Sequence, residues 1–140
     1  MDEQAGPAAR TEQDAGSSPA GAVDVAAALA GVTAHWTPRV VGRVNDQYVK
    51  VARLLGELVW HAHDEEDELF LVVSGRLRIQ LEDRPEVVLG PGQLSVVPRG
   101  VRHNPVAEEE VEIVLVETVT TTHTGAERTD RTVPIEQQLR

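Results

Sequence analysis

The feature that most constrains the fold is a series of short runs rich in Val, Leu and Ile that starts at Arg39 and is interrupted by turn-forming residues. The interruptions are Asn-Asp, Ser-Gly, Asp-Arg-Pro, Gly-Pro-Gly and Pro-Arg-Gly, all of which favour tight backbone turns. Connections this short leave no room for crossover helices, so the strands are expected to pair antiparallel. The sequence therefore predicts an all-β domain, built as a sandwich or a small jelly-roll-like barrel.

Strand-length runs are expected at residues 39–44, 47–55, 57–63, 68–73, 76–82, 86–89, 93–97, 101–106 and 111–119. A short N-terminal helix precedes them, because apolar residues recur at helical spacing from Val25 to Val32. Asp24 stands just before this stretch, where an aspartate caps a helix, and Gly31 weakens the helix end.

The chain of 140 residues is long enough for one domain with one sizeable core. Residues 1–22 are rich in Ala, Gly, Ser, Pro and acids and contain no aromatic residue, so we expect a disordered N-terminal arm. Residues 23–122 form the predicted barrel domain. Residues 123–140 are polar again and are expected to be a C-terminal tail, packed over the domain or loosely held.

The formal net charge of -10 argues against nucleic acid as a partner, because phosphate backbones are bound mainly through basic patches. Cysteine is absent, which excludes disulfides and thiolate chemistry. The acidic N-terminus does not look like a signal peptide, and no apolar run approaches the roughly 20 residues of a membrane span. We expect a cytoplasmic protein with no membrane or nucleic-acid partner and a small-molecule substrate in the barrel lumen.

The segment "WHAHDEEDELFLVVSG", residues 60–75, places two histidines one residue apart. In a strand, His61 and His63 point to the same side while Trp60 points to the other, where we expect it to pack between sheets or at a subunit contact. Two imidazoles about 7 Å apart along a strand can converge on one metal ion. The alternative interpretation of this segment is an exposed, charged hairpin that binds no metal.

Further metal ligands are expected from the strands that follow. On the returning strand Glu68 shares a face with Phe70, so Glu68 is the candidate third ligand and Phe70 a core residue or pocket wall. Asp67 competes for the third position. His103 is the fourth candidate, on a strand whose register is set by the surrounding glycines and proline. Three imidazoles and a carboxylate suit a divalent transition metal ion: Fe, Mn, Ni, Cu or Zn.

These residues resemble the two conserved motifs of the cupin superfamily. The first motif is matched by a glycine, H-x-H, a glutamate and a second glycine; the second is matched by G-x5-P-x-G-x2-H. The matching residues are Gly56, His61, His63, Glu68 and Gly75, then Gly92, Pro98, Gly100 and His103. Two departures are visible: four residues rather than five separate Gly56 from His61, and Ala107 stands where cupins often have asparagine.

The resemblance implies the cupin double-stranded β-helix, with a metal ion held by the four positions that carry it in cupins. The spacing to Gly75 favours Glu68 over Asp67 as the third ligand. Similar barrels commonly pair through sheet edges, so we expect a homodimer, in which the segment from Arg39 to Val44 covers an edge or crosses to the partner.

The remaining polar residues have plainer interpretations. Residues 64–67 and 108–110 are expected to be solvated turns rather than calcium sites. His35 and His123 lie outside the motifs and are expected at the surface. Tyr48 and Lys50 are the only candidates for a catalytic base, and like Arg53 they either face a substrate or lie exposed.

The function expected from this ligand set is a metal-dependent enzyme acting on a small polar metabolite, since such an ion keeps open positions for substrate and O₂. Dioxygenase-type oxidation is the first candidate reaction, because the sequence shows no nucleophile and no second acid–base pair. A metal-assisted isomerase or lyase for a sugar or hydroxy acid is the alternative. A non-catalytic module that binds a ligand through its metal is a third.

Overall fold

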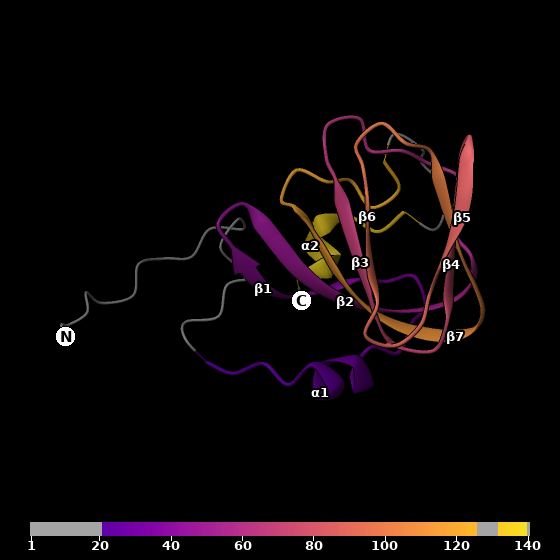
Figure 1. Ribbon diagram of the computed structural model, residues 1–140. Coiled ribbons are helices and arrows are strands. Elements are labelled where there is room, and N and C mark those ends of the chain that lie inside the picture. The colour runs from indigo at the N-terminus through magenta and orange to yellow at the C-terminus, as the bar shows by residue number, and fades with distance from the viewer. Residues whose placement is uncertain (1–20, 126–131, 140) are drawn as a thin grey trace.

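The computed structural model describes residues 21–125 and 132–139 (Figure 1). Its elements are α1 (Val25–Ala30), β1 (Arg39–Val44), β2 (Gln47–Glu57), β3 (Glu68–Ser74), β4 (Leu77–Leu81), β5 (Arg84–Leu89), β6 (Leu94–Val97), β7 (His103–Thr118) and α2 (Ile135–Gln138). Within the described residues no helix is long and apolar enough to cross a membrane. The first 20 residues of the expected N-terminal arm lie outside the described part.

The strands form one antiparallel system in the order β1-β2-β7-β3-β6, with β4 paired to both β5 and β7. Strand β7 joins the two walls: its residues 103–106 pair with β4, and its residues 112–117 pair with β3. Figure 1 shows β3 and β6 in one wall and β4 and β5 in the other. This architecture confirms the predicted all-β barrel with a short helix on its N-terminal side.

The core fills the space between the two walls. Its fully buried members include Val72 on β3, Leu77 and Ile79 on β4, and Ile113 on β7. Alternate side chains of β3, and of β7 from Val111 onward, point into this space, as the burial of every second residue there shows. A second, smaller apolar cluster lies outside the barrel, where α1 packs against β2.

Helix α1 begins where the sequence predicts, because the Asp24 side chain accepts a hydrogen bond from the backbone N–H of Ala27 at 3.1 Å. Leu29 and Val32 then pack on Val51 of β2. The helix therefore covers part of the outer surface of the sheet and lies away from the lumen.

Two expected strand boundaries are wrong. The runs 47–55 and 57–63 were expected to be separate strands, but β2 continues through Gly56 to Glu57, and residues 58–67 then form a loop. His61 and His63 therefore lie on this loop, with His61 in an isolated bridge to His103. The positive φ of Gly56, 83°, and a register shift beside it let β2 bend without ending.

The expected turn at residues 108–110 is also wrong, because the runs 101–106 and 111–119 are parts of one 16-residue strand. On β2, Leu54 pairs with Val111 and Gly56 with Ala107, so residues 108–110 bulge out of the ladder. Their carboxylates stay in water while the backbone continues, which is why an acidic run does not end the strand.

The described part of the C-terminal tail contacts the barrel. Thr121 and Thr124 are buried after the end of β7, and Gln138 of α2 is 1% exposed. Thr124 and Thr132 join their hydroxyl groups at 2.7 Å. Helix α2 was not expected from the sequence.

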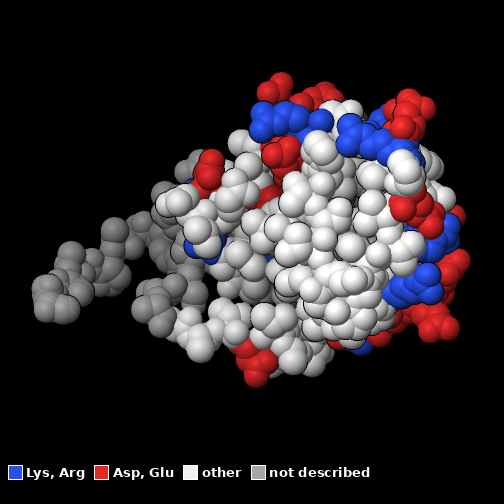
Figure 2. Space-filling model, in the orientation of Figure 1, with Lys and Arg blue, Asp and Glu red and all other residues white. Residues whose placement is uncertain are grey.

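The molecular surface is unevenly charged. On the face seen in Figure 2, charged side chains gather along the upper and right margins and leave a broad uncharged centre. Strand β6, at one edge of the sheet, exposes two apolar side chains, Leu94 at 55% and Val96 at 49%.

Candidate metal centre

Three backbone hydrogen bonds hold the loop that carries the two neighbouring histidines. The N–H of His61 donates to the carbonyl of His103 at 3.0 Å, and the N–H of His103 donates to the carbonyl of His61 at 2.8 Å. The N–H of Gly100 donates to the carbonyl of His63 at 2.8 Å. The loop is thereby fixed against the start of β7, which brings His61 and His103 together although they are far apart in the chain.

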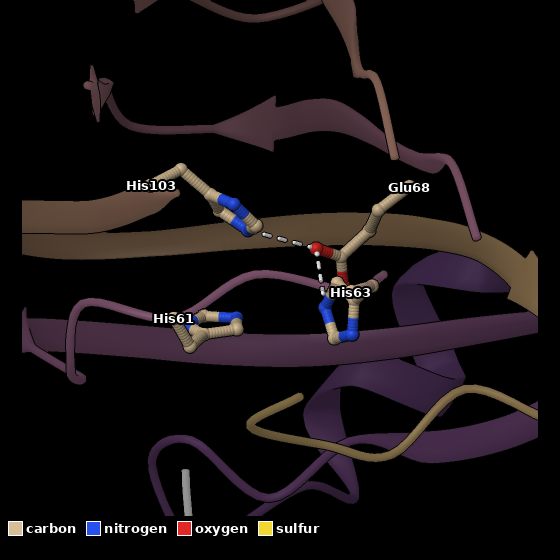
Figure 3. A group of neighbouring side chains, drawn as sticks. All are labelled: His61, His63, Glu68 and His103. Carbon is tan, nitrogen blue, oxygen red and sulfur yellow. Dashed lines mark hydrogen bonds and ion pairs between the residues drawn. The ribbon is translucent and has the colours of Figure 1, made fainter. Parts of the chain in front are cut away.

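Four side chains converge at this point (Figure 3). One ligand atom from each of His61, His63, Glu68 and His103 lies within 4.8 Å of the others, and all four residues are buried. The exposed fractions are 1%, 4%, 5% and 0% in that order. Glu68 begins β3 and His103 begins β7, so two strand starts and one loop build the cluster.

Backbone carbonyls orient two of the imidazoles. The Nδ1–H of His61 donates to the carbonyl of Val59 at 2.8 Å, and the Nδ1–H of His103 donates to the carbonyl of Val101 at 3.0 Å. In the neutral rings this leaves the Nε2 lone pairs available to the centre of the cluster. Metal-binding histidines usually show this arrangement, with the second nitrogen held by a carbonyl or carboxylate.

His63 gives the clearest indication of a metal site, because neither of its buried ring nitrogens has a regular hydrogen-bond partner among the described residues. Its Nε2 lies 3.3 Å from Oε1 of Glu68, and the Nε2 of His103 lies 3.2 Å from the same oxygen. Such contacts between lone-pair atoms need a proton or a cation between them. A buried nitrogen left without a partner is costly, so these residues fit a metal ion.

The protonation states suit metal binding. Burial, together with the charge of His103, lowers the pKa of His61 to about 4, so this imidazole is neutral. Burial opposes ionisation of Glu68, but His103 and His63 outweigh it and hold the pKa of Glu68 well below its usual range. Burial likewise opposes protonation of His63, but the Glu68 carboxylate raises the pKa of His63 overall. The ionised Glu68 and the neutral His61 are in the state that a metal requires, whereas at His63 a metal ion would replace the proton that Glu68 attracts.

A second buried carboxylate lies behind Glu68. Burial and the charge of Glu68 raise the pKa of Glu117 to about 8, so a protonated Glu117 donates a hydrogen bond to Glu68. Lys50, which is 1% exposed, contacts Glu117 at 2.6 Å and donates to the side-chain oxygen of Gln138. A continuous polar chain thus runs from helix α2 to the candidate metal centre.

A small cavity of about 30 Å³ adjoins the cluster. Its wall is mainly apolar, with His61 and Glu68 from the cluster and His123 from the C-terminal segment as its ionisable members among the described residues. The full lining is Trp36, Pro38, Ala52, Leu54, Leu58, His61, Glu68, Phe70, Pro105, Ile113, Leu115 and His123. The indole N–H of Trp36 donates to the Leu55 carbonyl, so it is satisfied within the protein.

Comparison with known proteins agrees with this geometry. The family model of the cupin domain (Cupin_2) matches residues 55–119, which contain all four clustered residues. The crystal structure of a cupin-2 domain containing protein from Shewanella frigidimarina NCIMB 400 is 36% identical, with a TM-score of 0.66 over 69% of this chain and 93% of that one. The chain belongs to the cupin superfamily.

Two further similar proteins limit what can be inferred about activity from similarity. The uncharacterized protein YdbB of Bacillus subtilis (strain 168) is 38% identical over 63 residues, which are 45% of this chain and 56% of YdbB. The match thus spans little more than half of that curated relative. Hydroquinone 1,2-dioxygenase from Sphingomonas sp. TTNP3 is 22% identical with a TM-score of 0.65, over 70% of this chain and 32% of that one. That likeness is one of fold alone.

The cupin barrel places the other candidate residues as follows. Phe70 lines the cavity. Asp67, the competitor of Glu68, is exposed and accepts a hydrogen bond from the Arg99 backbone N–H at 2.9 Å. Tyr48 and Lys50 are buried rather than exposed, and neither lines the cavity.

Three smaller expectations concern residues away from the cluster. His35 is exposed and contacts Glu110 at 2.8 Å, while Arg53 donates to the same carboxylate at 2.9 Å. Trp60, which was expected to pack between sheets or at a subunit contact, is 37% exposed, so it is not enclosed between sheets.

Sequence reasoning missed two residues of this region. The sequence predicted only that Glu117 lies in a strand. It lies two and four positions after Leu115 and Ile113, however, so its side chain points to the same, inward face of that strand. His123 was expected at the surface, yet it is half-buried and lines the cavity. No local pattern marks His123, because its position depends on how the C-terminal segment folds back over the barrel.

Proposed function

We propose that this cupin is a metal-dependent enzyme that acts on a small molecule, with dioxygenase-type oxidation as its reaction. The proposed ligands are His61, His63, Glu68 and His103. The observation that carries the proposal is the set of buried imidazole nitrogens around one carboxylate: two rings are oriented by backbone carbonyls, and the third, His63, contacts Glu68 without a regular hydrogen bond to any described residue. A bound divalent Fe, Mn, Ni, Cu or Zn ion would supply a Lewis acid and, for the redox-active metals, electron transfer.

The residues around the cluster have separable tasks in this proposal. The carbonyls of Val59 and Val101 fix the tautomers of His61 and His103. Glu68 brings negative charge to the centre, and the hydrogen bond from Glu117 orients it. The apolar wall, including Phe70, excludes water from the space beside the ligands.

The cavity wall supports oxidation over isomerisation. An isomerase or lyase for a sugar or hydroxy acid needs a side chain that moves a proton, and a sugar needs many hydrogen-bond partners. Among the described lining residues outside the cluster, His123 is the one ionisable group, and its Nδ1 already accepts a backbone N–H. We therefore favour a compound with an apolar body and few oxygen atoms over the expected polar metabolite. The isomerase or lyase remains the second enzyme candidate, and a non-catalytic ligand-binding module the third.

Metal content tests the ligand set. Protein purified from its native host is expected to contain about one transition metal ion per chain, measured by elemental analysis. Glu68→Gln should weaken metal binding by about tenfold or more. Asp67→Asn is the matched control, because this neighbouring acid is exposed and lies outside the cluster. Retention of metal by Glu68→Gln, or its loss in Asp67→Asn, would contradict the assignment.

Reaction type is tested separately. Oxygen uptake by the iron-loaded protein with candidate substrates, absent from the zinc-loaded protein, is the result expected of an oxidative enzyme. Turnover under strict anaerobiosis would favour the isomerase or lyase. Tight ligand binding without turnover would favour the binding module.

A further inference from the structure

An acidic pocket adjoins the loop that carries the two neighbouring histidines. Its volume is about 210 Å³, and it is lined by Ala62, His63, Asp64, Glu65, Glu66, Thr122 and Gly125. Three of these residues are carboxylates, and no Lys or Arg is among the described residues that line the pocket. The pocket is therefore a region of negative potential, which attracts cations.

Contacts with the chain after β7 hold the walls of the acidic pocket. The Glu66 carboxylate accepts a hydrogen bond from the Thr120 hydroxyl group at 2.9 Å. Gly125 has a φ of 60° and lies against the backbone of Ala62; a Cβ at this glycine would collide with the Ala62 carbonyl oxygen. The segment that follows β7 is thus packed directly on the loop between its two histidines.

His63 connects the acidic pocket to the candidate metal centre. It is the one residue of the four-residue cluster that lines this pocket. Its side chain is 2% exposed, and its Nε2 lies 3.3 Å from Glu68. The other nitrogen, Nδ1, is also buried and has no regular hydrogen-bond partner among the described residues, and in Figure 3 it lies on the side of the ring away from Glu68. A buried nitrogen in this state is a ready acceptor for a proton or a cation.

The hydrogen bonds of the three imidazoles differ in a way that bears on their freedom to move. Backbone carbonyls of Val59 and Val101 hold the Nδ1–H groups of His61 and His103. No such bond holds Nδ1 of His63. The His63 ring can therefore turn without breaking a hydrogen bond to the backbone, and it is also the ring that lines the acidic pocket.

The apolar cavity beside the cluster is a poor route for a metal ion. It measures about 30 Å³, and its mainly apolar wall offers nothing to replace the water around a divalent cation. The acidic pocket is larger and carries charge. Within residues 21–125 and 132–139, however, no second group of three or more side chains brings its ligand atoms as close together as the metal cluster does. The pocket acids are thus placed to attract a cation without chelating it.

We propose that the acidic pocket is the entry route for divalent metal ions. The carboxylates of Asp64, Glu65 and Glu66 attract the hydrated cation, and His63 is the first ligand of the cluster to bind it. This inference rests on the proposed function, because it presupposes the metal centre. It assigns to the acidic run a role in how fast the metal loads, separate from the four ligands that hold it.

Two variants that each lose three negative charges test this route. The pocket triple variant combines Asp64→Asn, Glu65→Gln and Glu66→Gln. The bulge triple variant, its matched control, combines Glu108→Gln, Glu109→Gln and Glu110→Gln. The control acids line a different surface groove, with Arg76 and Arg78, that shares no lining residue with the acidic pocket. A difference between the two variants therefore reports the position of the charges rather than their number.

The assay mixes the full-length, metal-free protein with Cu(II) chloride in a stopped-flow instrument. Trp36 lines the cavity beside His61 and Glu68, so its fluorescence should be quenched when copper binds. The contribution of the metal centre is the quenching that is absent from a His103→Ala variant. Copper content at saturation should be the same in the wild type and in both triple variants.

The expected result is a change in rate that depends on salt. At an ionic strength of about 0.01 M, the pocket triple variant should bind copper about tenfold more slowly than the wild type. The bulge triple variant should be slowed by no more than about twofold. At about 1 M, where charges are screened within about 3 Å, the difference should disappear.

Each other outcome would overturn the route. Equal rates in the wild type and the pocket triple variant would do so. Equal slowing in both triple variants would show that net charge alone matters, and a difference that persists at high salt would indicate a structural change. If circular dichroism shows that the pocket triple variant is unfolded, its three single substitutions give the same test, each with an expected slowing of about twofold. Failure of the wild type to bind copper through His103 would instead overturn the proposed function, and the route with it.

Discussion

Replacement of Lys50 by methionine should destabilise the protein strongly, because it removes the cation from a buried ion pair. Lys50 and Glu117 are 1% and 3% exposed and lie 2.6 Å apart. Methionine keeps the straight, apolar stem but leaves Glu117 and Gln138 without the lysine ammonium. Removal of one partner from a buried pair costs about 3–5 kcal/mol.

We place the expected loss at about 3 kcal/mol, the lower end of that range, for a structural reason. Glu117 has a pKa of about 8 and already shares a proton with Glu68 at neutral pH, so the loss of Lys50 leaves less unpaired charge than it would beside a fully ionised carboxylate. The double variant, which combines Lys50→Met with Glu117→Gln, contains neither charge. Its free energy of unfolding should lie within about 1 kcal/mol of the wild-type value.

Urea denaturation of the four proteins of this double-mutant cycle, followed by circular dichroism, measures the free energies of unfolding. Arg78→Met is the control, since Arg78 pairs with Glu86 at the surface and its loss should change stability far less. A Lys50→Met variant as stable as the wild type would refute the reasoning. So would a double variant no more stable than Lys50→Met.

Two further predictions concern other parts of the chain. Gly75→Ala should lower the melting temperature more than Gly56→Ala: both glycines have positive φ, but a Cβ at Gly75 would lie 2.6 Å from the Glu110 carbonyl oxygen, whereas one at Gly56 meets nothing within 4 Å. Equal melting temperatures would show that the close approach is unimportant. The predicted homodimer should have twice the chain mass by light scattering; if it forms through the exposed apolar residues of β6, Leu94→Lys should yield monomer, whereas an unchanged mass would exclude that edge.

Much of the fold was predictable because local chemistry determines it. The turn residues mark most strand ends, and Asp24 marks the helix start. The clustering of His61, His63, Glu68 and His103 was anticipated from motif spacing, although the expected strand geometry around the two histidines was wrong. Backbone hydrogen bonds, from His61 to His103 of β7 and from Gly100 just before β7 to His63, place both histidines rather than strand alternation.

The missed features depend on contacts between distant parts of the chain. Lys50 was expected to face a substrate or solvent, and its burial depends on Glu117 and on Gln138, which is 88 residues away. Helix α2 has four residues, too few for a periodic pattern to identify. The acidic run at 108–110 was misread as a turn because composition alone does not distinguish a turn from a bulge inside a strand.

The bent strand β7 reaches Glu68 twice, through His103 at its first residue and through Glu117 near its last. The acidic bulge at 108–110 lies between these two residues and acts as a spacer of fixed length. Its carboxylates are exposed and form only surface ion pairs, so neutral substitutes should be tolerated there. Deletion of a single bulge residue, by contrast, would pull the following part of β7 out of register and turn Glu117 away from Glu68. At this surface segment, length rather than composition is the constrained property.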